Sequence, residues 1–211
     1  MTKGRAVGPA TLSHVVIDIR PGSQADAPAI ARVRRESWFA AYTGIIDRAL
    51  IDRATATGGS AVDPPVYRRT LVAVGGDDPA VIGFASFGPE RTVISASPPP
   101  APVGGHFAAG GAVRALVDDD LTPAGRAGDT GELYALYVTP AWWSTGAGRG
   151  LMTSVLTALR AAGYLRAVLW VLTDNARARR FYERSGFTPD GATNVLAGLG
   201  GVPELRYVRD L

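Results

Sequence analysis

A glycine-rich turn is the part of this sequence where residue types and spacing point most directly to chemistry. Residues 144–150 read STGAGRG and stand between a strand-like and a helix-like apolar run. The first amides of a helix lack intrahelical partners and the dipole is positive there, so such a turn binds anions. Gly146, Gly148 and Gly150 let a bulky anion approach the backbone, and Arg149 adds a cation. The pattern predicts a pyrophosphate site; a turn that only permits close helix packing is the alternative.

Two familiar phosphate motifs do not fit this turn. A Walker loop needs a Gly-Lys-Ser/Thr run, and the turn contains no lysine. A dinucleotide fingerprint needs G-x-G-x-x-G and an acidic residue about 20 positions later. Here the spacing is G-x-G-x-G, and the later position falls in an apolar strand region.

Two segments together resemble the GNAT superfamily of N-acetyltransferases. LYVTP at 136–140, followed by GAGRGLM at 146–152, is similar to that family's acyl-CoA-binding motif, Arg/Gln-x-x-Gly-x-Gly/Ala. NARARRFYERSGF at 175–187 is similar to the family's pattern N-x-x-A-x-x-F-Y-x-x-x-G-F. The segments stand in the family's order and separation, and the resemblance extends from about residue 15 to the end.

This resemblance implies a fold and a reaction. The fold would be α/β (α+β), with a mixed, mostly antiparallel central sheet flanked by helices and a splayed parallel strand pair at the cofactor site. The reaction would move the acetyl group of acetyl-CoA, used as a co-substrate, to a primary amine of a small molecule or peptide by direct transfer in a ternary complex. A non-catalytic acyl-CoA sensor on the same fold is the alternative, and a regulator that binds a nucleotide phosphate is a third hypothesis.

For the cofactor, the resemblance implies contacts that are mostly made by the backbone. The strand would pair with the pantetheine arm, the turn would hold the pyrophosphate, and the following helix would contact the arm and the thioester sulfur. The residues are Leu136, Tyr137 and Val138; Trp143, Ser144, Thr145, Gly146, Ala147, Gly148, Arg149 and Gly150; and Asn175 and Tyr182.

Trp143 departs from the family motif, because its position is usually arginine or glutamine. We expect one side-chain contact to the cofactor to be lost and cofactor affinity to be weakened, with Arg149 compensating in charge. Trp142 and Trp143 are expected to pack around the turn.

Tyr182 and Glu132 are the predicted catalytic residues. The leaving thiolate has a conjugate acid of pKa about 8.5 and a phenol titrates near 10, so the tyrosine that the resemblance places at the sulfur is a reasonable proton donor. A core aromatic is the alternative for Tyr182. An alkyl amine has a pKa near 10.4 and must be deprotonated before attack. Glu132 is the predicted base, on a strand face shared with Tyr134, Leu136 and Val138, with an exposed strand-end carboxylate or a water relay as the alternatives.

The sequence says less about the residues that would bind the acceptor amine than about those that would bind the cofactor. Some relatives carry a glutamate base five positions before the helix-start asparagine, and Trp170 stands there in this chain. The family's first helices and loops form the acceptor wall, so Trp38, Phe39, Tyr42 and the run Asp118-Asp119-Asp120 are candidates for binding an aromatic or cationic amine. Ordinary core or solvated loop is the alternative for each.

The elements that position these residues follow from hydrophobic spacing. Strands are expected at 15–19, 70–75, 80–87, 132–138, 166–172 and 204–208, with a turn at 76–79. Helices are expected after a cap at Ser23, at 47–54, from the glycine turn to Gly163, and from Asp174 or Asn175 to Gly186. Residues 1–13 are expected to be flexible, and 14–211 to form one N-acetyltransferase domain with a Gly/Pro/Ala-rich insertion at about 89–130 that is either a lid or a flexible segment.

Composition excludes several function classes. The 211 residues are 46% apolar and 19% charged, which is typical of a globular domain. No cysteine is present, so disulfides and thiol nucleophiles are excluded. No metal site is expected because His14 and His106 lie far apart, with magnesium held by carboxylates alone as the alternative. The net charge of +3, without basic runs longer than two, argues against nucleic-acid and membrane surfaces. Neither a membrane span nor a signal peptide is visible, which predicts a cytoplasmic location. The oligomeric state, including a homodimer, stays open.

Overall fold

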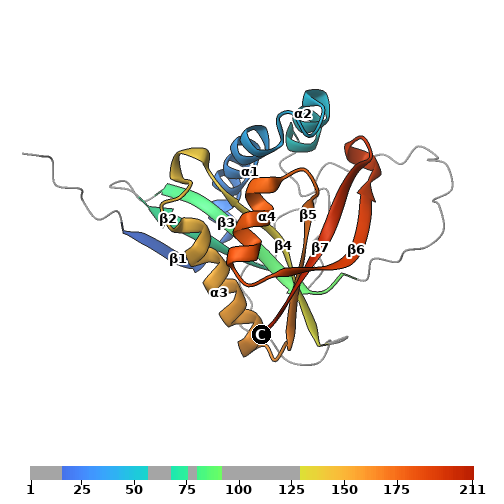
Figure 1. The fold of residues 1–211 in the computed structure, drawn as a ribbon. Coiled ribbons are helices and arrows are strands. Elements are labelled where there is room, and N and C mark those ends of the chain that lie inside the picture. The colour runs from blue at the N-terminus through green and yellow to red at the C-terminus, as the bar shows by residue number, and fades with distance from the viewer. Residues whose placement is uncertain (1–15, 57–67, 76–79, 92–128) are drawn as a thin grey trace, which may run out of the picture.

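The computed structural model describes residues 16–56, 68–75, 80–91 and 129–211 (Figure 1). The expected flexible segment 1–13, the turn 76–79, nearly all of the insertion 89–130 and the run Asp118-Asp119-Asp120 lie outside these ranges.

The described strands form one seven-stranded sheet in the order β1-β2-β3-β4-β5-β7-β6. Five of the six neighbouring pairs are antiparallel, and β4 and β5 run parallel. This confirms the predicted mixed, mostly antiparallel sheet. The strands are β1 Ile17–Pro21, β2 Arg69–Gly75, β3 Ala80–Pro89, β4 Thr130–Val138, β5 Arg166–Leu172, β6 Thr188–Leu196 and β7 Val202–Asp210.

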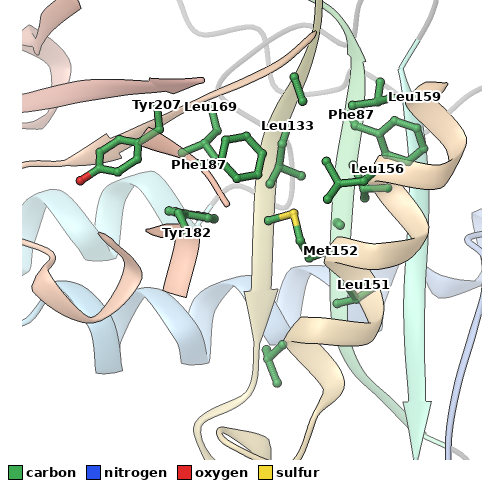
Figure 2. Packing of buried hydrophobic residues seen from close by; sticks show 14 of the residues in the cluster. Phe87, Leu133, Leu151, Met152, Leu156, Leu159, Leu169, Tyr182, Phe187 and Tyr207 are labelled. Carbon is green, nitrogen blue, oxygen red and sulfur yellow. The ribbon is translucent and has the colours of Figure 1, made fainter. Parts of the chain in front are cut away.

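Helices cover both faces of this sheet (Figure 1). The helices are α1 Ala27–Tyr42, α2 Arg48–Ala56, α3 Ala147–Ala161 and α4 Ala176–Arg184, with short 3-10 turns at Gln24–Asp26, Pro140–Trp142 and Ala197–Leu199. The larger core joins α3 and α4 to one face (Figure 2). A second cluster joins α1 to the other face, through Val33 of α1 and Val72, Val81 and Phe84 of the sheet.

The amphipathic pattern of α3 explains its place. The five residues predicted to mark its buried side are all at most 5% exposed: Leu151, Met152, Val155, Leu156 and Leu159. Figure 2 shows Leu151, Met152, Leu156 and Leu159 along the side of α3 that faces β3 and β4. This packing fixes the axis of α3, and therefore its first amides, relative to the sheet.

The start of α1 depends on Asp26, which is 8% exposed. Its carboxylate accepts hydrogen bonds from the Ser23 amide and hydroxyl at 2.7 and 2.9 Å and from both terminal nitrogens of Arg20 at 2.8 Å. Ser23 therefore caps the 3-10 turn Gln24–Asp26, as a helix-start signal predicts, and α1 itself begins at Ala27.

Strand β6 is absent from the sequence-based prediction. Its sequence TPDGATNVL contains Pro189, Asp190 and Gly191, which are typical of a turn. The register with β7 shifts between Pro189 and Thr193, so these residues are accommodated as an irregularity in the ladder. Such an irregularity is tolerated because β6 lies at the edge of the sheet and, among the described strands, pairs with β7 only.

Among the described residues, no helix is both long and apolar enough to cross a membrane.

Candidate functional site

The parallel pair β4 and β5 separates partway along its length. Register pairs join Thr130–Leu133 to Arg166–Leu169, and none joins the rest of β4 to β5. The separation begins at an irregularity in β4: Leu133 pairs with Phe87 and Ala135 with Ser86, so Tyr134 is an extra residue. Such a bulge bends a strand and increases its twist. The result is an opening between the carboxyl ends of β4 and β5, as the splayed pair predicted.

The bulge also changes which side chains of β4 share a face. Leu133, Leu136 and Val138 all belong to the core beneath α3, although 133 and 136 differ in parity. Glu132 and Tyr134 both contact Arg91 on the other side of the strand. The prediction that Glu132 shares a face with Leu136 and Val138 is therefore wrong, because one extra residue inverts the alternation after Leu133.

Beyond the bulge, one edge of β4 is not paired with any strand that the structure describes. The Thr139 amide donates to the Ile82 carbonyl of β3 at 2.8 Å. In the alternation of an antiparallel ladder, Tyr137 then turns its backbone groups toward its register partner Phe84, and Leu136 and Val138 turn theirs toward the opening. The Val138 carbonyl accepts hydrogen bonds from Ser37 Oγ at 2.9 Å and Trp143 Nε1 at 2.7 Å.

The glycine turn that follows β4 ends in a left-handed residue. Gly146 is the N-cap of α3 with φ +104°, and no heavy atom lies within 4 Å of a Cβ placed there. Its glycine is therefore required by backbone conformation rather than by crowding. The first helical hydrogen bond runs from the Gly150 amide to the Gly146 carbonyl at 2.9 Å. The amides of Ala147, Gly148 and Arg149 precede it and have no helical acceptor.

The other two glycines face neighbouring elements. A Cβ at Gly148 would lie 3.6 Å from the Phe181 ring of α4, and a Cβ at Gly150 would lie 3.4 Å from Ile19 of β1. Both are ordinary van der Waals distances, so crowding does not require glycine at either position, and Gly150 faces the sheet rather than the turn. Arg149 is exposed beside the free amides.

The two tryptophans have separate surroundings. Trp142 packs on β2, since a Cβ at Gly75 would lie 3.2 Å from its ring. Trp143 binds the Val138 carbonyl through its indole nitrogen, and the guanidinium carbon of Arg177 lies 3.8 Å from its ring centre. Trp142 therefore packs on the sheet, and Trp143 joins the end of β4 to α4; that both rings also pack around the turn stays a prediction.

Helix α4 presents Asn175 and Tyr182. The Asn175 side chain is the N-cap and accepts from the Ala178 amide at 3.0 Å, which confirms the predicted helix start. Tyr182 is 9% exposed and makes edge contacts with Phe181 and Phe187, with ring centres 5.4 and 6.3 Å apart. Figure 2 shows its ring beneath Phe187, on the side of β4 away from α3. Burial, and secondly Tyr137, raise the pKa of Tyr182.

Glu132 is fully buried and tightly paired. Its carboxylate accepts hydrogen bonds from the Arg91 amide at 2.8 Å and the Arg91 Nε at 3.0 Å, and it also contacts the Arg91 Nη2. The pair joins the end of β3 to β4. The alternative of an exposed carboxylate at a strand end is therefore wrong.

Aromatic residues gather on the α1 side of the opening. Trp38, Tyr42 and Tyr137 form what we call the aromatic group: ring centres of Trp38 lie 5.2 Å from Tyr42 and 6.5 Å from Tyr137, and the two tyrosine hydroxyls are 3.4 Å apart. Phe39 contacts the guanidinium groups of Arg35 and Arg48 instead. Of the three acceptor candidates predicted on the first helix, Trp38 and Tyr42 thus lie together beside β4, and Phe39 does not.

Sequence reasoning missed Glu204, which is half-buried at the start of β7 and hydrogen-bonded to Asn194 at 2.8 Å. The signal was its place in the predicted strand 204–208, whose alternation separates Glu204 and Arg206 from Leu205 and Tyr207.

Comparison with known proteins agrees with this geometry. The model of the acetyltransferase (GNAT) family matches residues 30–187. A mycothiol acetyltransferase of Beutenbergia cavernae is 52% identical over 60 residues, which are 28% of this chain and 20% of that protein. An uncharacterized N-acetyltransferase of Mycobacterium tuberculosis is 38% identical over 80 residues, 38% of this chain and 51% of that protein. The chain therefore matches about half or less of these relatives' length.

Solved structures share the fold at low sequence identity. The PaiA N-acetyltransferase of Thermoplasma acidophilum, in complex with coenzyme A, superimposes with a TM-score of 0.64 at 18% identity, covering 93% of this chain and 99% of that one. The ribosomal-protein-S18-alanine N-acetyltransferase of Escherichia coli superimposes with a TM-score of 0.55 at 13% identity, covering 92% and 94%.

Proposed function

The chain belongs to the acetyltransferase (GNAT) family, and on this premise we propose that it transfers the acetyl group of acetyl-CoA directly to a primary amine of a small molecule or peptide. The observation that carries the proposal is the coincidence of two features at the carboxyl end of β4. The strand separates from β5 there, and the turn that follows leads into the amides at the start of α3.

These features fit acetyl-CoA. The edge of β4 offers Leu136 backbone groups and the Val138 amide to the pantetheine arm, in the manner of an added strand. The amides of Ala147, Gly148 and Arg149 suit the pyrophosphate. Asn175 and the exposed turn residues Ser144 and Thr145 lie at the same end of the sheet and complete the proposed contacts.

Tyr182 is the proposed proton donor. Bound acetyl-CoA would supply an acetyl group activated as a thioester. The Tyr182 hydroxyl is protonated at neutral pH, because a phenol titrates near 10 and burial raises the pKa of Tyr182 further, so the hydroxyl holds a proton for the departing sulfur. The amine must lose its own proton, and Glu132 is the base that the sequence predicts. Its hydrogen bonds with Arg91 favour the competing role of positioning β3 against β4.

We propose that the aromatic group binds the acceptor and determines its chemical class. Trp38, Tyr42 and Tyr137 present ring faces and hydroxyls beside the opening, which suits a cationic or aromatic amine. The mycothiol in the name of some relatives does not decide the acceptor, because the similar segment is a fifth of the Beutenbergia protein. We also propose that residues 14–211 form one domain, supported by the single sheet that joins β1 to β7.

Calorimetric titration with acetyl-CoA tests the first step, and absence of binding at millimolar cofactor would end the proposal. Release of free CoA is then followed with a thiol reagent, which has no protein background because the chain contains no cysteine. The acceptor panel is n-butylamine, tyramine, spermidine and a glycine-led tripeptide, with mass spectrometry to identify the acetylated product. Steady CoA release with product formation is the expected result.

A non-catalytic acyl-CoA sensor is the second candidate. It is favoured by Trp143 at the position usually held by arginine or glutamine and by the engagement of Glu132 with Arg91. Tight binding of acetyl-CoA without turnover of any panel amine would support it.

A further inference from the structure

Glu204 lies beside the end of β5, where β5 has separated from β4. In the β7 register it is opposite Leu172, the last residue of β5. Leu172 packs in a cluster that includes Trp38 and Tyr42 of the aromatic group. Leu205, the next residue along β7, packs in the core beneath α3 and α4, so Glu204 projects to the opposite face. This face carries the aromatic group.

The carboxylate of Glu204 is held differently from that of Glu132. In the described part of the chain, one donor reaches Glu204: the Asn194 side chain, from β6, to Oε1 at 2.8 Å. Glu132 instead has both of its oxygens engaged by Arg91. A proton acceptor needs a free lone pair, so Glu204 is the better placed of the two carboxylates.

The surroundings of Glu204 mix both signs of charge. Burial raises its pKa, and the charge of Glu132 acts in the same direction, while Asn194 and the charge of Arg91 oppose them. Glu204 in turn is among the groups that raise the pKa values of Tyr42 and Tyr137.

The next charged side chain on the same face of β7 is that of Arg206. It pairs with Glu90 at 3.0 Å and with Asp190 at 2.8 Å. Arg206 is thus occupied by two carboxylates other than Glu204.

We propose that Glu204 receives the ammonium group of the acceptor and takes its proton. This inference rests on the proposed acetyl transfer. The ammonium gives one proton to the Glu204 carboxylate, and the nitrogen lone pair then forms the C–N bond to the acetyl carbon. The C–S bond breaks, its electron pair leaves with sulfur, and the sulfur takes the Tyr182 proton. The second nitrogen proton and then the proton on Glu204 pass to solvent, which restores the carboxylate, and solvent returns one proton to the Tyr182 oxygen.

Asn194 is a positioning residue in this scheme. By donating to Oε1, its amide fixes the carboxylate and leaves Oε2 for the acceptor. Asn194→Ala should raise KM more than it lowers kcat, because it frees the carboxylate to rotate without removing it.

The test compares Glu204→Gln with wild type over pH 6–10, using n-butylamine and the glycine-led tripeptide as acceptors. We expect kcat/KM to fall about 100-fold at neutral pH, the usual scale for loss of a general base. The deficit should shrink as pH rises, because a growing share of the amine is already neutral. It should be smaller for the tripeptide, whose α-amino pKa is about 8 against about 10.4 for the alkyl amine. Glu204→Asp should recover part of the rate.

Glu90→Gln is the matched control, since it removes a nearby carboxylate that pairs with Arg206, and its kcat/KM should stay within about threefold of wild type. A deficit of Glu204→Gln that is the same at every pH and for both amines would overturn the base assignment while leaving acetyl transfer intact. Wild type that binds acetyl-CoA and acetylates no panel amine would overturn the proposed function and this inference together. Acetyl-CoA titration of each variant should give the wild-type Kd.

Discussion

The guanidinium of Arg177 stacks on the indole of Trp143, with 3.8 Å between its carbon and the ring centre. The same indole donates to the Val138 carbonyl at 2.7 Å. One side chain thus connects the free edge of β4 to the first turn of α4, on either side of the opening. Trp143 stands where the family motif usually has arginine or glutamine, and its side chain links β4 to α4.

Trp143→Gln should tighten acetyl-CoA binding. The amide restores a side-chain donor at the motif position, and one hydrogen bond of net value about 1 kcal/mol lowers Kd about fivefold. Loss of the stacked ring should at the same time lower Tm. Calorimetric titration and thermal unfolding check the two effects. Trp142→Phe is the control, because Trp142 packs on β2 and its replacement should leave the Kd for acetyl-CoA unchanged. An unaltered Kd in Trp143→Gln would show that Trp143 does not weaken acetyl-CoA binding.

Tyr182→Phe should slow turnover about 100-fold, the usual scale for loss of a proton donor, and leave acetyl-CoA affinity unchanged. The phenyl ring keeps the contacts with Phe181 and Phe187, so Tm should stay near wild type. The rate of CoA release at saturating cofactor is the measurement. An unchanged rate would assign the proton to water and Tyr182 to the core.

Gly146→Ala should lower both stability and acetyl-CoA affinity. A non-glycine residue in the left-handed region costs about 1–2 kcal/mol, and relaxing that strain would turn the amides of α3 away from the anion. Gly44→Ala is the matched control: its φ is +89°, it has equal free space, and it lies after α1. We expect the two variants to lose similar stability in urea and only Gly146→Ala to bind acetyl-CoA more weakly. Equal Kd values for acetyl-CoA in the two variants would show that the turn at Gly146 does not contribute to cofactor binding.

Glu132→Gln should lower the free energy of unfolding by about 2 kcal/mol, because the buried Glu132 side chain loses charge-assisted hydrogen bonds with Arg91, whose own side chain is about a third exposed. Arg91→Gln with Glu132→Gln should cost less than the sum of the single changes, and urea unfolding of all four proteins measures this coupling. If Glu132 is the base, folded Glu132→Gln should also lose the part of the pH–rate profile in which the rate rises as the base is deprotonated. If Glu132 only positions β3 against β4, the folded variant should keep that part of the profile.

Asp26→Asn should destabilise the chain by about 2 kcal/mol at neutral pH, from the loss of charge-assisted hydrogen bonds at the start of α1. Arg20 holds the pKa of Asp26 well below its usual range, so the carboxylate stabilises the fold above its unfolded pKa of about 3.9. That contribution is lost as pH falls toward the lowered folded pKa. The stability difference between wild type and variant should therefore be full at pH 6 and shrink below pH 4, and a difference independent of pH would contradict the ion pair.

Local patterns predicted the parts of the site that local forces decide. The buried side of α3, the cap at Asn175 and the glycine at Gly146 each follow from spacing within a few residues. The surroundings of Glu132 and Glu204 do not, since Arg91 lies 41 residues from Glu132, and the pairing of β5 with β7 places Glu204 opposite Leu172, which packs with Trp38 and Tyr42. Strand β6 was missed for a related reason: turn-like Asp190 and Gly191 interrupt its ladder, and the pairing of Pro189 and of Thr193 with the distant strand β7 holds the two sides of that interruption in one strand.

The extra residue Tyr134 determines two properties of β4 at once: its separation from β5 and the face on which its later side chains lie. Removing one residue there would close the ladder between β4 and its neighbours and, in the same step, exchange the inner and outer side chains of 135–138. A deletion that abolished the opening would thus also expose the apolar surface that holds α3. Length changes in this strand are therefore expected to be rejected during evolution even where activity is under no selection, whereas the side chain at Trp143, after the strand has ended, differs from the family motif without changing the register of β4.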